Sequence, residues 1–85
     1  MNIGPYSLTR TCTACPEQYD VFLDGKQVGY LRLRHGHFYA DYPTCGGKTV
    51  FEASPIGDGI FDEKERDFYL KAAVSAIDNE INLSR

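Results

Sequence analysis

The stretch YDVFLDGKQVGYLRLRHGHFYADY, Tyr19–Tyr42, decides the fold of this chain. It holds three runs rich in β-branched, aromatic and leucine residues, and short turn sequences separate them. Asp24-Gly25 is typical of a tight hairpin because both residues tolerate a positive φ. Gly36, within HGH, supplies the second turn. The stretch therefore predicts antiparallel strands over 19–24, 27–34 and 37–42.

A further strand and a helix follow this stretch. KTVFEA, at 48–53, predicts a fourth strand, and the Pro- and Gly-rich SPIGDGI after it is typical of a loop. Asp62, with Glu65 three residues later, forms a capping-box-like helix start. Beyond it, apolar residues recur every three or four positions, which indicates one stripe of an amphipathic helix. The stripe consists of Leu70, Ala73, Val74, Ile77 and Ile81.

The expected fold is α+β, a three- or four-stranded antiparallel β-meander packed on one C-terminal α-helix. With 85 residues the chain makes one domain with a small core. Its 6 Tyr and 5 Phe compensate for the absence of Trp, because aromatic side chains bury a large area each. Residues 1–16 are expected to form an extended arm or a short edge strand, and residues 17–85 the α+β domain.

The charge distribution excludes several partners. The net charge is −3, with five basic against four acidic residues up to Val50 and four against eight from Phe51 on. This acidic balance argues against duplex DNA, which requires several phosphates to be neutralised.

No apolar run approaches the ~20 residues that cross a bilayer. The start MNIGPYSLTR does not resemble a signal peptide, so we expect a cytoplasmic protein with reduced thiols.

A single helix can cover only one face of the predicted sheet. Alternation along the strands assigns the covered face to Leu31, Leu33, Phe38 and Ala40. The opposite face then presents Tyr30, Arg32, Arg34, His37 and Tyr39, unless the first sixteen residues or a second chain cover it.

These five residues are the candidate binding site. Tyr and Arg dominate the energetics of protein–protein interfaces. The same residue types can also stack unpaired bases and contact a single-stranded backbone, although Asp20, Asp24 and Asp41 make the face electrically mixed. We therefore predict a non-enzymatic protein-binding module whose partner is another protein or a second copy in a homodimer. A single-stranded nucleic-acid-binding domain is the alternative.

Cys12-x-x-Cys15 has the spacing of half a zinc site. In a meander, the turn that carries His35 and His37 lies at the same end of the sheet as these cysteines, whereas Cys45 lies at the other end. If zinc is bound, the set is therefore Cys12, Cys15, His35 and His37, which would make a small structural zinc domain. A redox pair is disfavoured because Pro16 and no helical pattern follow the motif. We predict no cofactor and ordinary thiols.

No catalytic motif points to an enzyme. The acidic residues around Asp58–Asp67 lie where carboxylates stabilise the positive end of a helix dipole. GxSxG, P-loop, GxGxxG and HExxH sequences are all missing. The chain is therefore predicted not to be an enzyme.

CPEQYDVFLDGKQVGYLRLRHGHFYADYPTCGGKTVFEA and GDGIFDEKERDFYLKAA together resemble short open reading frames of bacteria and their phages. The resemblance implies a bacterial or phage setting, and a phage or prophage factor that binds or inhibits a host protein. YADYP before a helix with an acidic start is also similar to HicB-type antitoxins, which cover a toxin's active site. The aliphatic-rich strand usual in those antitoxins is missing, and the similarity transfers no functional residue to this chain.

Overall fold

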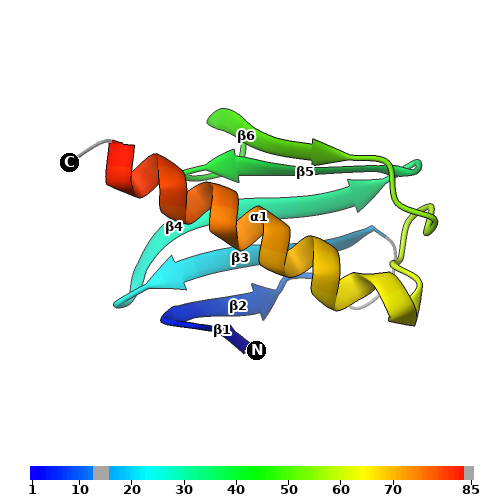
Figure 1. The fold of residues 1–85 in the computed structure, drawn as a ribbon, viewed down its shortest axis with the longest axis horizontal. Helices are drawn as coiled ribbons and strands as arrows, with labels where there is room; N and C mark the ends of the chain where they lie inside the picture. Colours follow the sequence, from blue (N-terminus) through cyan, green and yellow to red (C-terminus); the bar gives the residue numbers. More distant parts are fainter. Residues whose placement is uncertain (13–15, 84–85) are drawn as a thin grey trace.

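The computed structural model describes residues 1–12 and 16–83. An antiparallel sheet of six strands, paired in sequence order, packs against one C-terminal helix (Figure 1). The elements are β1 Asn2–Ile3, β2 Tyr6–Arg10, β3 Glu17–Leu23, β4 Lys26–Arg34, β5 His37–Tyr42, β6 Lys48–Ala53 and α1 Glu63–Leu83. The predicted α+β class, the antiparallel meander and the single C-terminal helix are confirmed.

The number of strands was underestimated, because residues 2–10 extend the sheet. β1 and β2 form a hairpin at the edge beside β3, where the prediction had an extended arm or a short edge strand. Tyr6 and Leu8 alternate with polar residues and are buried against the helix side. The Tyr6 hydroxyl donates a hydrogen bond of 2.5 Å to Asp78 on α1. These apolar contacts hold β2 in the sheet.

The two central hairpins have the turns that their sequences predict. Asp24 and Gly25 adopt φ values of 52° and 81°, and His35 and Gly36 adopt 53° and 71°. Two successive residues with positive φ produce the turn whose twist matches that of the flanking strands. The turns therefore set the register in which β3, β4 and β5 pair.

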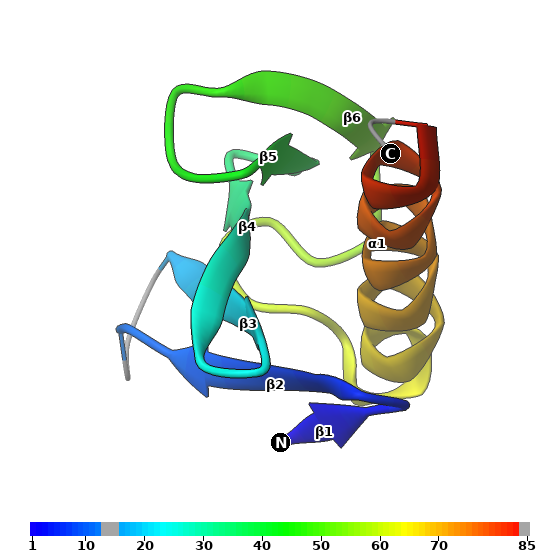
Figure 2. The same cartoon turned by 90° about the vertical axis from the view of Figure 1, so that its left-hand side faces the viewer.

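The helix packs on one side of the sheet and leaves the other side without a helix (Figure 2). Leu31, Leu33, Phe38 and Ala40 are fully buried beneath it, as predicted. From the apolar stripe, Leu70, Ala73, Val74 and Ile77 are buried and Ile81 is partly buried. Gly29 permits the close approach, since a Cβ there would lie 2.4 Å from Ile77 Cδ1. Within the described residues, no helix is both long and apolar enough to span a membrane.

The predicted capping box begins α1. The Asp62 side chain accepts a hydrogen bond from Lys64 N (2.9 Å), and Glu65 accepts one from Asp62 N (3.1 Å). Glu65 also accepts bonds from the backbone of Ile56 and Gly57, both at 2.8 Å. The helix start thereby holds the preceding loop in place.

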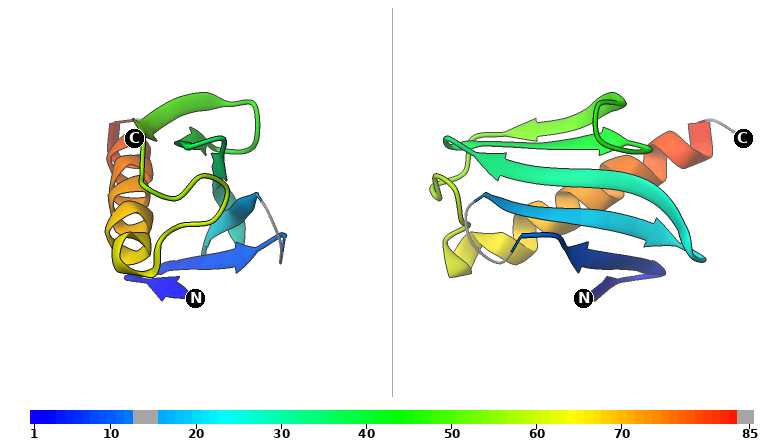
Figure 3. Two further views of the ribbon diagram at one scale, coloured as in Figure 1. Left: turned by 90° about the vertical axis from the view of Figure 1, so that its right-hand side faces the viewer. Right: turned by 180° about the vertical axis from the view of Figure 1, so that it is seen from behind.

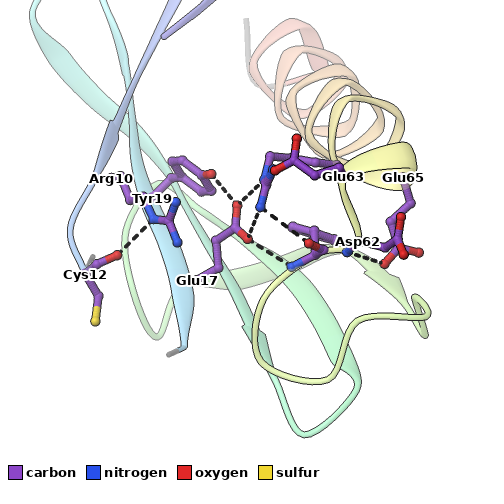
Figure 4. A network of polar contacts seen from close by, with 9 residues as sticks. Arg10, Cys12, Glu17, Tyr19, Asp62, Glu63 and Glu65 are labelled. Atoms are coloured by element: carbon purple, nitrogen blue, oxygen red, sulfur yellow. Dashed lines mark hydrogen bonds and ion pairs between the residues drawn. The ribbon is translucent and has the colours of Figure 1, made fainter. Parts of the chain in front are cut away.

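A buried carboxylate joins the helix start to the sheet (Figure 4). Glu17, the first residue of β3, is fully buried. It accepts hydrogen bonds from Arg66 Nε (2.8 Å), from Phe61 N (2.9 Å) and from the Tyr19 hydroxyl. Arg66 also binds Glu63 at 2.6 Å. β3, the loop and α1 therefore meet at one side chain.

The same contacts change the acidity of the groups involved. Burial by itself raises the pKa of Glu17, but the hydrogen bonds from Arg66, Tyr19 and Phe61 outweigh it, and the pKa falls below its ordinary value. Burial and the neighbouring carboxylate raise the pKa of Tyr19 to about 12. Glu17 is therefore ionised and Tyr19 neutral at physiological pH.

Replacing Glu17 by Gln is expected to destabilise the domain by about 3 kcal/mol, because it leaves the Arg66 charge without its buried partner. Urea unfolding monitored by circular dichroism measures this free energy. Glu63→Gln is the matched control, since its side chain is 89% exposed and also pairs with Arg66. The control should cost about 0.5 kcal/mol or less. Equal losses in the two variants would contradict the assigned role of Glu17.

Acid should remove the contribution of Glu17. Because the folded-state pKa lies below the ordinary value of 4.5, the stabilisation is complete above pH 4.5 and is lost as pH falls through the folded-state pKa. Burial raises the pKa of Glu65, but hydrogen bonds from the backbone of Ile56, Gly57 and Asp62 outweigh it and lower this pKa too. The wild-type protein therefore loses both contributions in acid. The difference in unfolding free energy between wild type and Glu17→Gln isolates Glu17. It should stay constant above pH 4.5 and shrink as the pH is lowered further, and a difference that stays constant down to acid unfolding would refute the expectation.

Candidate functional site

Strand alternation brings all five predicted binding residues to the side of the sheet away from α1. Arg32 pairs with Tyr39 and Arg34 with His37 across β4 and β5, and Tyr30 pairs with Asp41. Residues directly opposite each other in a sheet project from the same side. The shared side follows from the hairpin turn at His35-Gly36, which fixes this register.

This side of the sheet faces the reader in the right-hand view of Figure 3. We call its exposed or half-buried centre the outer face. Arg34 and His37 are exposed, whereas Arg32 and Tyr39 are half-buried. Two neighbours extend the row of Arg32 and Tyr39, with Gln18 beside Arg32 and Glu52 beside Tyr39. The outer face consists of Gln18, Arg32, Arg34, His37, Tyr39 and Glu52.

Tyr30 differs from its expected exposure. It is 8% exposed, and its hydroxyl donates a hydrogen bond of 3.1 Å to Gln18. The loop between β5 and β6 lies on this side of the sheet (Figure 2), held by a bond of 3.0 Å from Gly46 N to Asp41. Burial raises the pKa of Tyr30, and Cys45 on this loop is close enough to contribute. Tyr30 therefore supports the outer face from below and offers little contact area.

Arg32 is the charged centre of the outer face. A hydrogen-bonding contact with Tyr39 raises the pKa of Arg32, so the guanidinium stays protonated and positively charged. Its Nε atom is buried and has no hydrogen-bond partner among the described residues. Buried polar atoms normally have partners. The guanidinium therefore retains unused hydrogen-bonding capacity.

The rim of the outer face carries both signs of charge. His37 Nε2 lies 3.0 Å from Glu52 Oε1, with both side chains more than half exposed. Arg34 Nε donates to His35 Nε2 at 3.2 Å. Exposed pairs of this kind contribute little to stability. The centroid of the Tyr39 ring lies 5.7 Å from that of His37, so this rim borders the central tyrosine.

Gln18 and Glu52 were not predicted as site residues. Glu52 belongs to the predicted fourth strand, and its alternation with Phe51 and Ala53 was the available signal. Gln18 lies outside the strand predicted to begin at Tyr19, and β3 begins two residues earlier. Strand boundaries are where pattern-based prediction is least precise.

The candidate zinc ligands have other contacts. Cys12 follows β2 and His35 joins β4 to β5, so both lie at one end of the sheet, as the meander predicts. Cys15 lies outside the described residues. His35 contacts Arg34, and His37 contacts Glu52. In the described ranges 1–12 and 16–83, no three His, Cys, Asp or Glu side chains form a group that could hold a metal ion.

Comparisons of the chain with models of protein families, with curated proteins and with solved structures found no match.

The different burial of Tyr30 and Arg34 predicts different effects on stability. Tyr30→Ala should lower the unfolding free energy by about 3 kcal/mol, because it leaves a cavity under the outer face. Arg34→Ala, at an exposed position of the same strand, should change it by about 0.5 kcal/mol or less. Urea denaturation of both variants measures the difference. Little loss on Tyr30→Ala would show that this tyrosine is not packed as described.

Proposed function

We propose that this domain is a non-enzymatic module that binds another protein through the outer face. The observation that carries the proposal is a sheet side without a helix, on which two arginines and a tyrosine remain exposed or half-buried. Arg and Tyr supply a large share of the energy in protein–protein interfaces. They project here from central strands, so the backbone that carries them is already ordered before binding.

The charge pattern supports a protein partner. The basic side chains of Arg32, Arg34 and His37 lie on β4 and β5, whereas Glu52 lies beside Tyr39 on β6 and the half-buried Asp20 lies opposite Tyr30 on β3. A partner surface with the opposite arrangement of charges would fit this mixture. The partner we expect provides a carboxylate for the accessible part of the half-buried Arg32 guanidinium.

Single-stranded nucleic acid is the second candidate. Tyr39, which lies on β5 opposite Arg32, could stack a base while Arg32 and Arg34 contact phosphates. Glu52 and Asp20 would repel that backbone, and the chain has a net charge of −3. These charges favour the protein partner.

The resemblance to bacterial and phage reading frames makes a bacterial host protein the target we propose, with inhibition as the outcome.

The test uses the immobilised domain and a bacterial lysate, followed by titration of each retained protein in purified form. Tyr39→Ala combined with Arg32→Ala should weaken binding by about 2 kcal/mol or more, a loss of roughly thirtyfold in affinity. Phe68→Ala is the matched control, because Phe68 is 68% exposed on the opposite side of the domain. Its affinity should be unchanged. Partners that bind the double variant as tightly as wild type would overturn the proposal.

Ionic strength separates the two candidate partners. Affinity for single-stranded nucleic acid should fall steeply between about 50 and about 200 mM salt, because counterion release drives it. Binding of a protein through Tyr39 and Arg32 should depend much less on salt. The titrations are therefore repeated at both concentrations with the purified partner and with a mixed-sequence oligonucleotide. Tight, salt-sensitive binding of the oligonucleotide alone would favour the second candidate.

A further inference from the structure

The two edges of the sheet differ in length. β1 offers two residues, whereas β6 offers six. Within the described part of the chain, none of the backbone hydrogen bonds made outside the strand ladders and the helix involves residues 48–53. The N–H and C=O groups of β6 that point away from β5 are therefore available. An edge of this kind is a template for pairing with another strand.

The helix covers the two ends of β6 unequally. It crosses the sheet diagonally, and its last turns approach the beginning of β6 (Figure 1). Lys48 bonds Glu80 at 2.7 Å there, beside a shallow groove of about 290 Å³ that includes Val50, Ala76 and Leu83. Toward the other end, Phe51 and Ala53 lie opposite the buried Ala40 and Phe38 but stay partly exposed.

We propose that β6 pairs with β6 of a second copy of this chain, antiparallel, about a two-fold axis perpendicular to the sheet. In that arrangement the Lys48 end of each strand lies beside the Ala53 end of the other. The last turn of α1 in one copy, where Leu83 is 81% exposed, then approaches the Ala53 end of β6 in the other copy. That is the end of β6 that its own helix leaves open. Each copy thus supplies the apolar cover that the other lacks.

A second copy is the preferred occupant because of the unequal edges. Pairing β6 with β1 of another copy would build an open chain, but β1 is only two residues long. Pairing β6 with itself uses the same edge twice and closes after two copies. It also keeps both helices on one side and both outer faces on the other, so the dimer presents two outer faces side by side.

Two features limit the strength of this contact. Lys48 is a charge on the edge, and the ladder between β5 and β6 shifts register at Ala40/Asp41. Charged residues and bulges both weaken edge pairing. The pairing is therefore weak, and the area that it buries stays below the ~1,200 Å² of a standard interface. The expected dimer is reversible.

Sedimentation from about 10 µM to about 1 mM should show a concentration-dependent dimer with a dissociation constant in that range. Leu83→Asp should raise the dissociation constant by about tenfold or more. Phe68→Asp is the matched control, since this exposed apolar residue lies in the half of α1 remote from β6, and its dimer should be unchanged. A chain that stays monomeric throughout, or a dimer that Leu83→Asp leaves intact, would overturn the proposal.

Hydrogen exchange in the wild-type chain provides a test that needs no variant. Amides of residues 50–53 that point away from β5 should become more protected as the concentration rises, while those of β1 should not. The double variant Arg32→Ala with Tyr39→Ala should dimerise normally, because the outer face takes no part in the pairing. Loss of the dimer in that variant would place self-association on the outer face and refute pairing through β6. Failure of the partner-binding proposal would leave all of these results unchanged.

Discussion

The Glu17 carboxylate holds together the sheet, the helix α1 and the loop that precedes this helix. Its fully buried charge needs Arg66, which lies 49 residues away on α1. Glu17 also fixes the loop before the helix, because its backbone N–H donates a hydrogen bond to the Gly59 carbonyl and its side chain accepts one from Phe61 N. A buried ion pair is favourable only when every polar atom is satisfied. The network meets this condition with Tyr19, Arg66 and the loop, and so specifies one docking position for the helix.

This docking position determines which surface is left for function. With α1 held over Leu31, Leu33 and Phe38, only the opposite side of the sheet can present a row of polar and aromatic side chains. The position of each residue of the outer face is then fixed by the pairing of its strand with the neighbouring strands. The surface that we propose to bind a partner is therefore a consequence of how the core closes.

Local patterns in the sequence account for the central fold. Asp24-Gly25 and the HGH turn predicted two hairpins, and the three- and four-residue apolar spacing predicted α1. The alternation of apolar and polar residues correctly assigned the side chains of β4 and β5 to the two sides of the sheet. What remained unpredicted depends on contacts between distant residues. β2 is held in the sheet partly by Tyr6, which bonds Asp78 on α1, 72 positions later, and Tyr30 lies on the side to which the loop after β5 folds back. No local signal marks the partnership of Glu17 and Arg66.

The sequential order of the sheet also has a consequence during synthesis. Each strand pairs only with its neighbours in the chain, so the sheet can assemble progressively on the ribosome. Hairpins form in about 1–10 µs, whereas translating the 21 residues of α1 takes about 1–4 s at 5–20 residues per second. The apolar side of the sheet therefore waits uncovered for a period about a million times longer than a hairpin needs to form. In that interval the nascent chain exposes the kind of surface that chaperones bind.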